Sequence, residues 1–465
     1  MTTRHASMRI ALTAVALAAL AGCSHFGPPP ERAAAKGDAL QRAEVPTQWA
    51  VAPAAELPVL GWRERVRQPQ LLKWVDQALA HNRDVQVAAL NVQRAQAQLA
   101  ATDAARLPSV GVGLGASRAP NSKGEQANTL TAGVQMPAWE IDLFGRLTSL
   151  SDAARAQLAA SEAGQRAAEL SVVGAVLQAA LALQADDELL AIARQTLGSR
   201  EESLKLSRLR ESVGAASQLE LQAQITLAAQ ARATLAQLSR QRAQDANALG
   251  LLLGQPATLP ATAVGTARLA DEAWVDELPA ALPATVLLRR PDVVQAEQTL
   301  RAAQANIAAA RAAFWPSITL TAQGGQVSSQ LAGLFEGGHL AYTVAANALL
   351  TVFDAGRRQA NLAQADVSQQ IAQAQYERAI QSAFREVADG LAGTATWREQ
   401  GAALQVQAAA ARETARLTQL KARQGAASVL EQLEAERGLW AADQAVLQAR
   451  LGELNNRVAL LKALG

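Results

Sequence analysis

The side chains that most often perform catalysis or bind metals are scarce in this sequence. The four histidines are His5, His25, His81 and His339, and they lie far apart along the chain. No group of histidine, cysteine, aspartate and glutamate has the spacing of metal ligands. The sequence also lacks a glycine-rich phosphate loop and a nucleophile elbow. It therefore predicts no enzyme, no metal and no cofactor.

Two charged clusters could do chemistry but have simpler interpretations. The acidic run at 186–188 (Asp-Asp-Glu) lies inside a long helical segment, and we interpret it as a solvated helix face. Arg289 and Arg290 immediately precede Pro291. We expect an ion pair at a helix boundary there rather than a basic binding site.

The single cysteine, Cys23, has a defined chemical context. It follows two arginines and about a dozen apolar residues, the layout of a secretory signal, which is too short to span a membrane. Leu-Ala-Gly-Cys at 20–23 resembles a bacterial lipobox, which implies that residues 1–22 are removed and Cys23 is acylated. The alternative is an ordinary signal peptide with an incidental cysteine. Because serine rather than aspartate follows Cys23, the resemblance to bacterial lipoproteins points to the outer membrane.

The composition favours long helices and excludes some partners. The chain has 465 residues, 50% of them hydrophobic, and is dominated by Ala, Leu, Gln, Arg and Glu. Without residues 1–22, which contain Arg4 and Arg9, 41 basic residues balance 41 acidic ones. Nucleic-acid binding needs a dense basic patch, and none appears. No stretch after the signal has 18 uninterrupted apolar residues, so we expect no helical transmembrane protein.

The two halves of the chain resemble each other. Pro108-Ser109-Val110 matches Pro316-Ser317-Ile318, and the Gly-Ala-Ala-Ser sequence at 214–217 matches the one at 425–428. Such self-similarity indicates a duplicated unit of helix, two strands, long helix, small-residue turn and helix. We divide the mature chain into a lipidated extended segment (23–69), a first repeat (70–254), an equatorial linker (255–280) and a second repeat (281–465).

Four segments alternate between apolar residues and polar or small ones, near 109–117, 129–136, 317–323 and 340–348. This pattern suits a transmembrane β-barrel with lipid outside and water inside, although an antiparallel sheet on a soluble core shows the same alternation. Open strand edges do not occur in lipid, so four strands per chain require several copies. Two copies give eight strands and a filled interior, and three give twelve strands and room for a pore. We expect residues 119–128 to form a loop.

Aromatic residues mark the ends of these segments. Prolines 108 and 316 stop the preceding helices, the first of which we expect over about 70–107. The aromatics where strands meet helices resemble an interfacial girdle, and two more are expected near the opposite end. The first group is Trp139, Phe144, Phe314, Trp315 and Phe353, and the second is Phe335 and Tyr342.

Long helices are predicted over about 145–212 and 357–424, each roughly 100 Å if continuous. Each is followed by a turn, where Gly214 or Gly425 permits a tight reversal and Ser217 or Ser428 can cap the returning helix. The last helix carries a heptad seam typical of a coiled coil. The seam consists of Leu433, Trp440, Leu447, Leu454 and Leu461, with Leu430, Leu451 and Val458 interleaved.

Several segments together resemble the outer-membrane factors of tripartite efflux systems, more closely the lipoprotein branch serving resistance-nodulation-division pumps. They are PQLLKWVDQALAHNRDVQVA, PAWEIDLFGRL, LLRRPDVVQAEQTLRAAQANIAAARAAFWPSI and the paired GAAS turns. The resemblance implies a mostly α fold with a small β part, in which a trimer forms a twelve-stranded outer-membrane barrel. A long helical barrel would project into the periplasm, with an equatorial collar built from about 253–277 and the chain ends. An inner-membrane pump and a periplasmic adaptor would dock at its tip, and transport through this protein would be passive.

The resemblance also implies roles for residues at the two turns. Arg210 and Lys421 match the family's basic docking position, so both turns are expected to touch the adaptor; a plain helical hairpin is the alternative. Leu430, Glu434 and Arg437 share one helix face and match the apolar, acidic and arginine positions that line the closed periplasmic entrance. Carboxylate–guanidinium bonds between neighbouring helices would hold that gate, and Glu431 would add charge. Alternatively, Leu430 and Arg437 belong to the coiled-coil seam, where Arg437 snorkels, and Glu434 is a solvated face residue.

Other functions deserve comparison with an efflux channel. A non-conducting coiled-coil lipoprotein would not need four amphipathic strands. A type I protein-secretion channel and a metal-ion exporter belong to the same channel class. Met136 is the only methionine after residue 22, and soft metal ions favour thioether ligands, so the sequence offers no methionine relay.

Overall fold

The computed structural model describes residues 36–46, 49, 61–120, 122, 124–254, 268–269, 274–276, 283–334 and 339–465. Cys23, Phe335 and residues 1–22 lie outside this part of the chain. The chain divides into two compact units. The sheet unit contains Pro108–Leu150 and Gln304–Ala365, and the helical unit contains Leu40–Leu107, Ser151–Ala303 and Asp366–Gly465.

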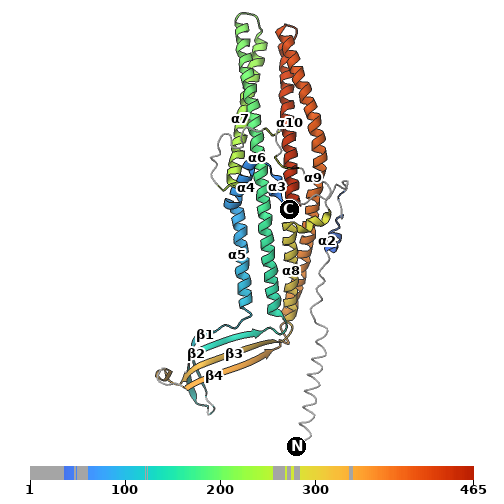
Figure 1. Ribbon diagram of the computed structural model, residues 1–465. Coiled ribbons are helices and arrows are strands. Elements are labelled where there is room, and N and C mark those ends of the chain that lie inside the picture. Colours follow the sequence, from blue (N-terminus) through green and yellow to red (C-terminus); the bar gives the residue numbers. More distant parts are fainter. Residues whose placement is uncertain are drawn as a thin grey trace. The chain divides into compact units, whose positions relative to one another are not determined.

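The sheet unit is built on four antiparallel strands in the order β1-β2-β3-β4 (Figure 1). They are β1 (Gly111–Pro120), β2 (Gln126–Ile141), β3 (Ser317–Ser328) and β4 (His339–Leu349), with a 3-10 turn η3 (Ala332–Leu334) between β3 and β4. All four predicted strands are confirmed. The loop predicted over 119–128 is too long, because the ladder of backbone hydrogen bonds continues to the pair Pro120–Gln126. Strand β2 also passes through a bulge between Met136 and Trp139.

The apolar face of the sheet is open to its surroundings. Val112, Val134 and Tyr342 lie in one row across the strands and therefore share a face. Val112 is 85% exposed and Tyr342 is 83% exposed. In a sheet that covers a soluble core these side chains would be buried. The exposure favours the lipid-facing interpretation of the alternation.

The helical unit contains two long antiparallel hairpins, α6–α7 and α9–α10 (Figure 1). Helices α6 (Arg146–Ser212) and α9 (Arg357–Arg423) each have 67 residues, which confirms both long continuous helices. The other helices are α2 (Lys36–Arg42), α3 (Trp62–Arg65), α4 (Pro69–His81), α5 (Arg83–Ala104), α7 (Gln218–Leu252), η2 (Ala284–Arg289), α8 (Pro291–Ala312) and α10 (Val429–Leu464). One 18-residue window of α6 is apolar enough to cross a membrane, but half of it is buried, as in a core helix.

The helix predicted over 70–107 is in fact two helices that meet at Asn82. The Asn82 side chain accepts hydrogen bonds from the backbone N–H of Asp84 and Val85, which caps α5. Its Nδ2 donates to the carbonyl oxygen of Leu252 at 3.0 Å. A distant backbone partner therefore fixes the break. The segment 23–69 is likewise not wholly extended, because it contains α2 and α3.

The core of the helical unit draws on the linker as well as the helices. Leu269, Trp274 and Val275 of the linker are fully buried among residues of α4, α6, α7 and α10. Arg457 of α10 donates to the carbonyl oxygen of Val275 at 3.2 Å. The predicted seam of α10 is buried at Leu433, Leu447, Leu454, Val458 and Leu461.

The acidic run at 186–188 is not the solvated face that we expected. Asp186 is buried, Asp187 is bound by Arg242 of α7, and Glu188 accepts a hydrogen bond from the N–H of Leu269 at 2.7 Å. Helix α7 and the linker pack on this side of α6, and periodicity within α6 could not reveal them.

The ion pair expected at the start of α8 is confirmed. Arg290 binds Asp292 at 2.7 Å and Glu386 of α9 at 2.9 Å.

Candidate channel-forming surfaces

The aromatic residues of the sheet unit gather where strands give way to helices. Phe144 and Trp315 stack with ring centroids 5.2 Å apart, and the Arg358 guanidinium lies 5.4 Å from the centroid of the Phe314 ring. Phe353 is 86% exposed. Exposed and stacked aromatics of this kind suit the headgroup region of a bilayer.

In each strand-to-helix turn of the sheet unit, an aspartate carboxylate accepts hydrogen bonds from backbone N–H groups. Asp142 accepts from the N–H groups of Leu147 and Thr148, and Asp354 accepts from the N–H groups of Gly356 and Arg358. These carboxylates satisfy backbone donors at the starts of α6 and α9. Sequence reasoning missed them, although a repeated signal was present, Asp-Leu-Phe-Gly-Arg at 142–146 and Asp-Ala-Gly-Arg at 354–357.

The two hairpin turns, residues 214–217 and 425–428, share one geometry. Gly214 has φ +72° and Gly425 has φ +73°, so both occupy the left-handed region as predicted. Ser217 accepts from the N–H of Glu220, and Ser428 forms a reciprocal capping box with Glu431.

The basic residues beside these turns serve as backbone acceptors and leave their side chains exposed. The carbonyl oxygens of Arg210 and Lys421 accept from the N–H groups of Ala215 and Ala426, both at 2.8 Å. Both side chains remain exposed. A docking partner could therefore reach each of them.

Three of the four predicted gate residues, Leu430, Glu431 and Glu434, line a groove on the α9–α10 hairpin. Leu430 is 65% exposed, so it leaves the coiled-coil seam that buries Leu433. The facing residues of α9 are small, which opens a groove of about 520 Å³. Its lining is Ala411, Thr414, Thr418, Leu430, Glu431, Glu434, Ala435 and Gly438.

Two of the charged gate residues pair along α10. Arg437 donates to Glu434 of the same helix at 3.1 Å, and the bonds expected between neighbouring helices of the assembled gate stay a prediction. An i,i+3 pair forms readily because both side chains lie on one face. The carboxylate of Glu431 accepts from the N–H and hydroxyl of Ser428, and these bonds hold its pKa below the ordinary value. Glu431 is therefore a capping residue that stays charged.

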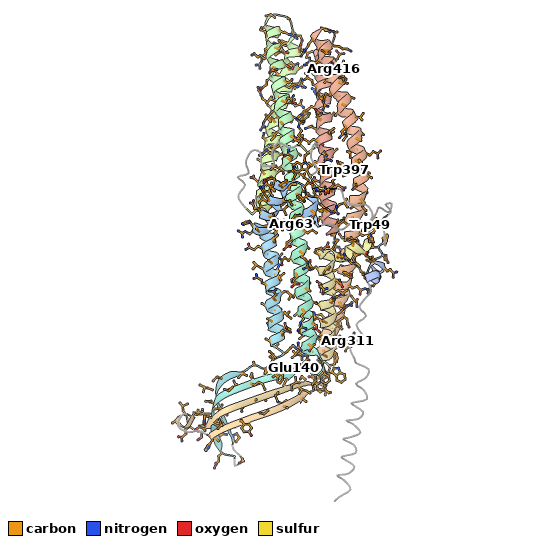
Figure 2. The ribbon with its side chains drawn as sticks, in the orientation of Figure 1. Trp49, Arg63, Glu140, Arg311, Trp397 and Arg416 are labelled. Atoms are coloured by element: carbon orange, nitrogen blue, oxygen red, sulfur yellow. The ribbon has the colours of Figure 1, made fainter. Side chains whose placement is uncertain are left out.

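A second i,i+3 pair lies near this groove on α9. Arg416, labelled in Figure 2, binds Glu413 at 2.7 Å. Among the residues that the structure describes, no group of three or more histidine, cysteine, aspartate or glutamate side chains could hold a metal ion.

Comparisons with known proteins agree with this arrangement. The family model described as outer membrane efflux protein matches residues 74–255 and 282–465. The chain is 39% identical over 427 residues to the probable efflux pump outer membrane protein TtgC of Pseudomonas putida, covering 90% of this chain and 87% of that protein. It is 35% identical over 465 residues to the outer membrane protein OprJ of Pseudomonas aeruginosa, covering 98% and 95%.

A solved structure shows the same fold. The open state of the MtrE outer membrane channel of Neisseria gonorrhoeae superposes with a TM-score of 0.80 at 32% identity, covering 90% of this chain and 94% of that one. The matches span both halves of the sequence and both structural units. The chain therefore belongs to the outer membrane efflux protein family, and its place is the outer membrane, with a large periplasmic part.

Proposed function

We propose that this chain is the exit duct of a tripartite efflux system, in which three copies form one channel. A resistance-nodulation-division pump in the inner membrane and a periplasmic adaptor would deliver drugs or other small toxic compounds to it. The main support for this proposal is the four-stranded sheet. Within the described residues β1 and β4 each pair on one side only, and the apolar face is exposed. Unpaired edges are excluded from lipid, so copies must close a barrel, and three supply twelve strands with a lumen.

Internal duplication belongs to the same proposal. The order α5-β1-β2-α6-α7 recurs as α8-β3-β4-α9-α10. This recurrence supports repeats over 70–254 and 281–465 that are joined by an equatorial linker.

The proposal is tested by deleting the gene and by weighing the assembly. We expect the deletion strain to become susceptible to several unrelated drugs, and native mass spectrometry of detergent-extracted protein to show three chains. A stable monomer with an intact barrel would contradict the assembly. Unchanged drug susceptibility, together with loss of a secreted protein or of metal resistance, would assign one of the other channel functions. Absence of conductance in planar bilayers would favour a structural lipoprotein.

Cys23, by the lipobox resemblance, carries acyl chains that assist anchoring. Replacing it by alanine behind a substitute cleavable signal should leave the protein in the outer membrane, because the exposed apolar sheet face provides its own attachment. Fractionation of the envelope checks this expectation, and intact mass checks the lipid on the wild type. Complete loss of the variant from the outer membrane would show that the lipid is essential.

The hairpin turns are the proposed contacts with the adaptor. Gly425→Asp should abolish drug resistance while trimer amount stays normal, because the turn tolerates aspartate at positive φ but gains a charge beside Lys421. Gly425→Asn, which has the same shape without the charge, is the matched control and should keep most resistance. Full resistance in the Gly425→Asp strain would argue against docking at this turn.

The proposed periplasmic gate is the ring that three copies of Leu430, Glu434 and Arg437 would form. Glu434→Ala with Arg437→Ala should raise single-channel conductance and sensitise cells to large antibiotics such as vancomycin. Carboxylate–guanidinium bonds between neighbouring copies would exist only in the closed state and would contribute roughly 0.2–1 kcal/mol each, so losing three of them would shift the closed–open equilibrium at least about threefold. Glu413→Ala with Arg416→Ala removes a pair of the same spacing on α9 and should leave conductance unchanged. Equal conductance in both double variants would place the constriction elsewhere.

A further inference from the structure

Two carboxyl groups meet at the buried contact between α6 and α7. Asp186 of α6 is only 7% exposed, and its Oδ2 has no hydrogen-bond partner among the described residues. Arg242, one turn before Asp245 on α7, binds Asp187, the residue next to Asp186, and Asp245 lies near enough for its carboxyl group to raise the pKa of Asp186. Asp245 in turn accepts from Gln241 of α7 at 3.0 Å. Nothing in the duct proposal uses this pair.

The charged groups around the pair are already engaged. Arg242 of α7 binds Asp187 through Nε, with a further contact of 3.5 Å from Nη2. Glu188 turns to the linker, where it accepts from the N–H of Leu269 at 2.7 Å. On that side Arg450 of α10 donates to the carbonyl oxygen of Leu269 and binds Glu453. The Arg242 guanidinium still acts on Asp186 through its charge, which lowers the pKa of that carboxyl.

Two carboxylates cannot share a hydrogen bond unless one of them holds a proton. Like charges at short range disfavour joint ionisation, and burial disfavours it further. The pKa of Asp186 is raised to about 7, and burial is the largest cause. The hydrogen bond and charge of Asp245 and the charge of Asp187 raise this pKa further, whereas the charge of Arg242 lowers it.

We propose that Asp186 and Asp245 form a proton-dependent clasp that joins α6 to α7. One proton shared between the two carboxyl groups holds the helices together in mildly acidic periplasm. Its loss in alkaline medium leaves two buried negative charges in contact and weakens the first hairpin. Asp186 lies 28 residues before Gly214, so the clasp acts about 42 Å along α6 from the hairpin turn.

The direction of the pH effect follows from proton binding. An unfolded aspartate releases its proton near pH 4, whereas folded Asp186 keeps it to about pH 7. Between these values the folded chain binds more protons than the unfolded chain, so stability falls as pH rises. The fall is complete once the pH exceeds the folded pKa. The clasp therefore contributes most in acid.

The test compares melting temperatures of the purified, detergent-extracted protein between pH 5.5 and 8.5. Asp186→Asn keeps the shape and cannot ionise, so its melting temperature should fall less with pH than that of the wild type, by about 2–4 °C. Asp152→Asn is the matched control, since Asp152 lies exposed on the same helix in a 3.0 Å pair with Arg155. It should keep the wild-type slope. Equal slopes for the wild type and Asp186→Asn would overturn the proposal.

A second measurement does not depend on the stability of any variant. Infrared spectra of the wild-type protein should show a protonated carboxyl C=O stretch at pH 5.5 that disappears by pH 8.5. The same difference band should be missing from Asp186→Asn, and in Asp245→Asn, where burial alone still raises the pKa of Asp186, it should disappear at a lower pH than in the wild type. A wild-type spectrum without such a band at pH 5.5 would show that both carboxyl groups are ionised and would refute the clasp.

Discussion

Gly325→Ala is expected to prevent assembly of a stable barrel, although it adds only one methyl group. A Cβ at Gly325 would lie 2.1 Å from the carbonyl oxygen of Ala132 and 2.5 Å from the Cα of Gly133 on the neighbouring strand. These are backbone atoms, so no side chain can rotate away. Strands β2 and β3 would have to separate, which breaks the ladder between them. A glycine pair at such a close approach is typical of a bent position in a sheet.

The adjacent glycine provides the control for this prediction. A Cβ at Gly324 would meet nothing closer than the Cβ of Tyr342 at 3.8 Å, so Gly324→Ala should assemble normally. Overpacking costs roughly 1–3 kcal/mol per site, and three copies would carry the same clash. We therefore expect trimer in the outer-membrane fraction to fall about tenfold or more for Gly325→Ala alone. Normal amounts of that variant would show that strands β2 and β3 can move apart to admit the methyl group.

The regular parts of the fold could be predicted because their signals are local. Dyad alternation gave the four strands, and the absence of proline and turn clusters gave helices of 67 residues. The positive φ values of Gly214 and Gly425 followed from small-residue turns between two helical patterns. Each of these features depends on neighbours within a few residues, which a single sequence displays directly.

The irregular parts depend on partners far away in the chain. Asn82 breaks a helical pattern because it caps α5 and also donates to Leu252, 170 residues later. The acidic run at 186–188 looked solvated because its partners, Arg242 and Leu269, lie 55 and 81 residues further on. Periodicity places a side chain on a helix face but does not show what packs against that face.

The candidate gate shows the same limit. Spacing placed Glu434 and Arg437 on one face of α10, which the structure confirms. The spacing does not tell whether Glu434 and Arg437 pair within one helix or between helices, because both arrangements place the two side chains on the same face. Glu431 was expected only to add charge. Its position three residues after Ser428 is the spacing of a capping box, which the sequence analysis did not identify.

The last prediction concerns Arg290, and the adjacent Arg289 provides the control. Arg290 is only 4% exposed and binds Asp292 at the start of α8, Glu386 of α9 and the carbonyl oxygen of Ala463 near the end of α10. Arg290→Ala would leave these acceptors without their cation. Since the Asp292 and Glu386 side chains are 45% and 40% exposed, we expect a cost below that of a fully buried pair, about 1.5–3 kcal/mol. We expect a large fall in melting temperature, whereas Arg289→Ala, at an exposed position, should have almost none.

The pH dependence separates this charge effect from a simple loss of packing. Burial alone would raise the pKa of Asp292, but the hydrogen bonds and charge of Arg290 hold it below the ordinary value. A depressed carboxyl pKa contributes stability that is present above about pH 4 and is lost as the pH falls through the folded pKa. Without the guanidinium, Asp292 can take up a proton instead. The melting-temperature deficit of Arg290→Ala should therefore shrink between pH 7.5 and pH 5. A deficit that is the same at both pH values would mean that Arg290 stabilises the fold through packing of its aliphatic stem rather than through the charges it binds.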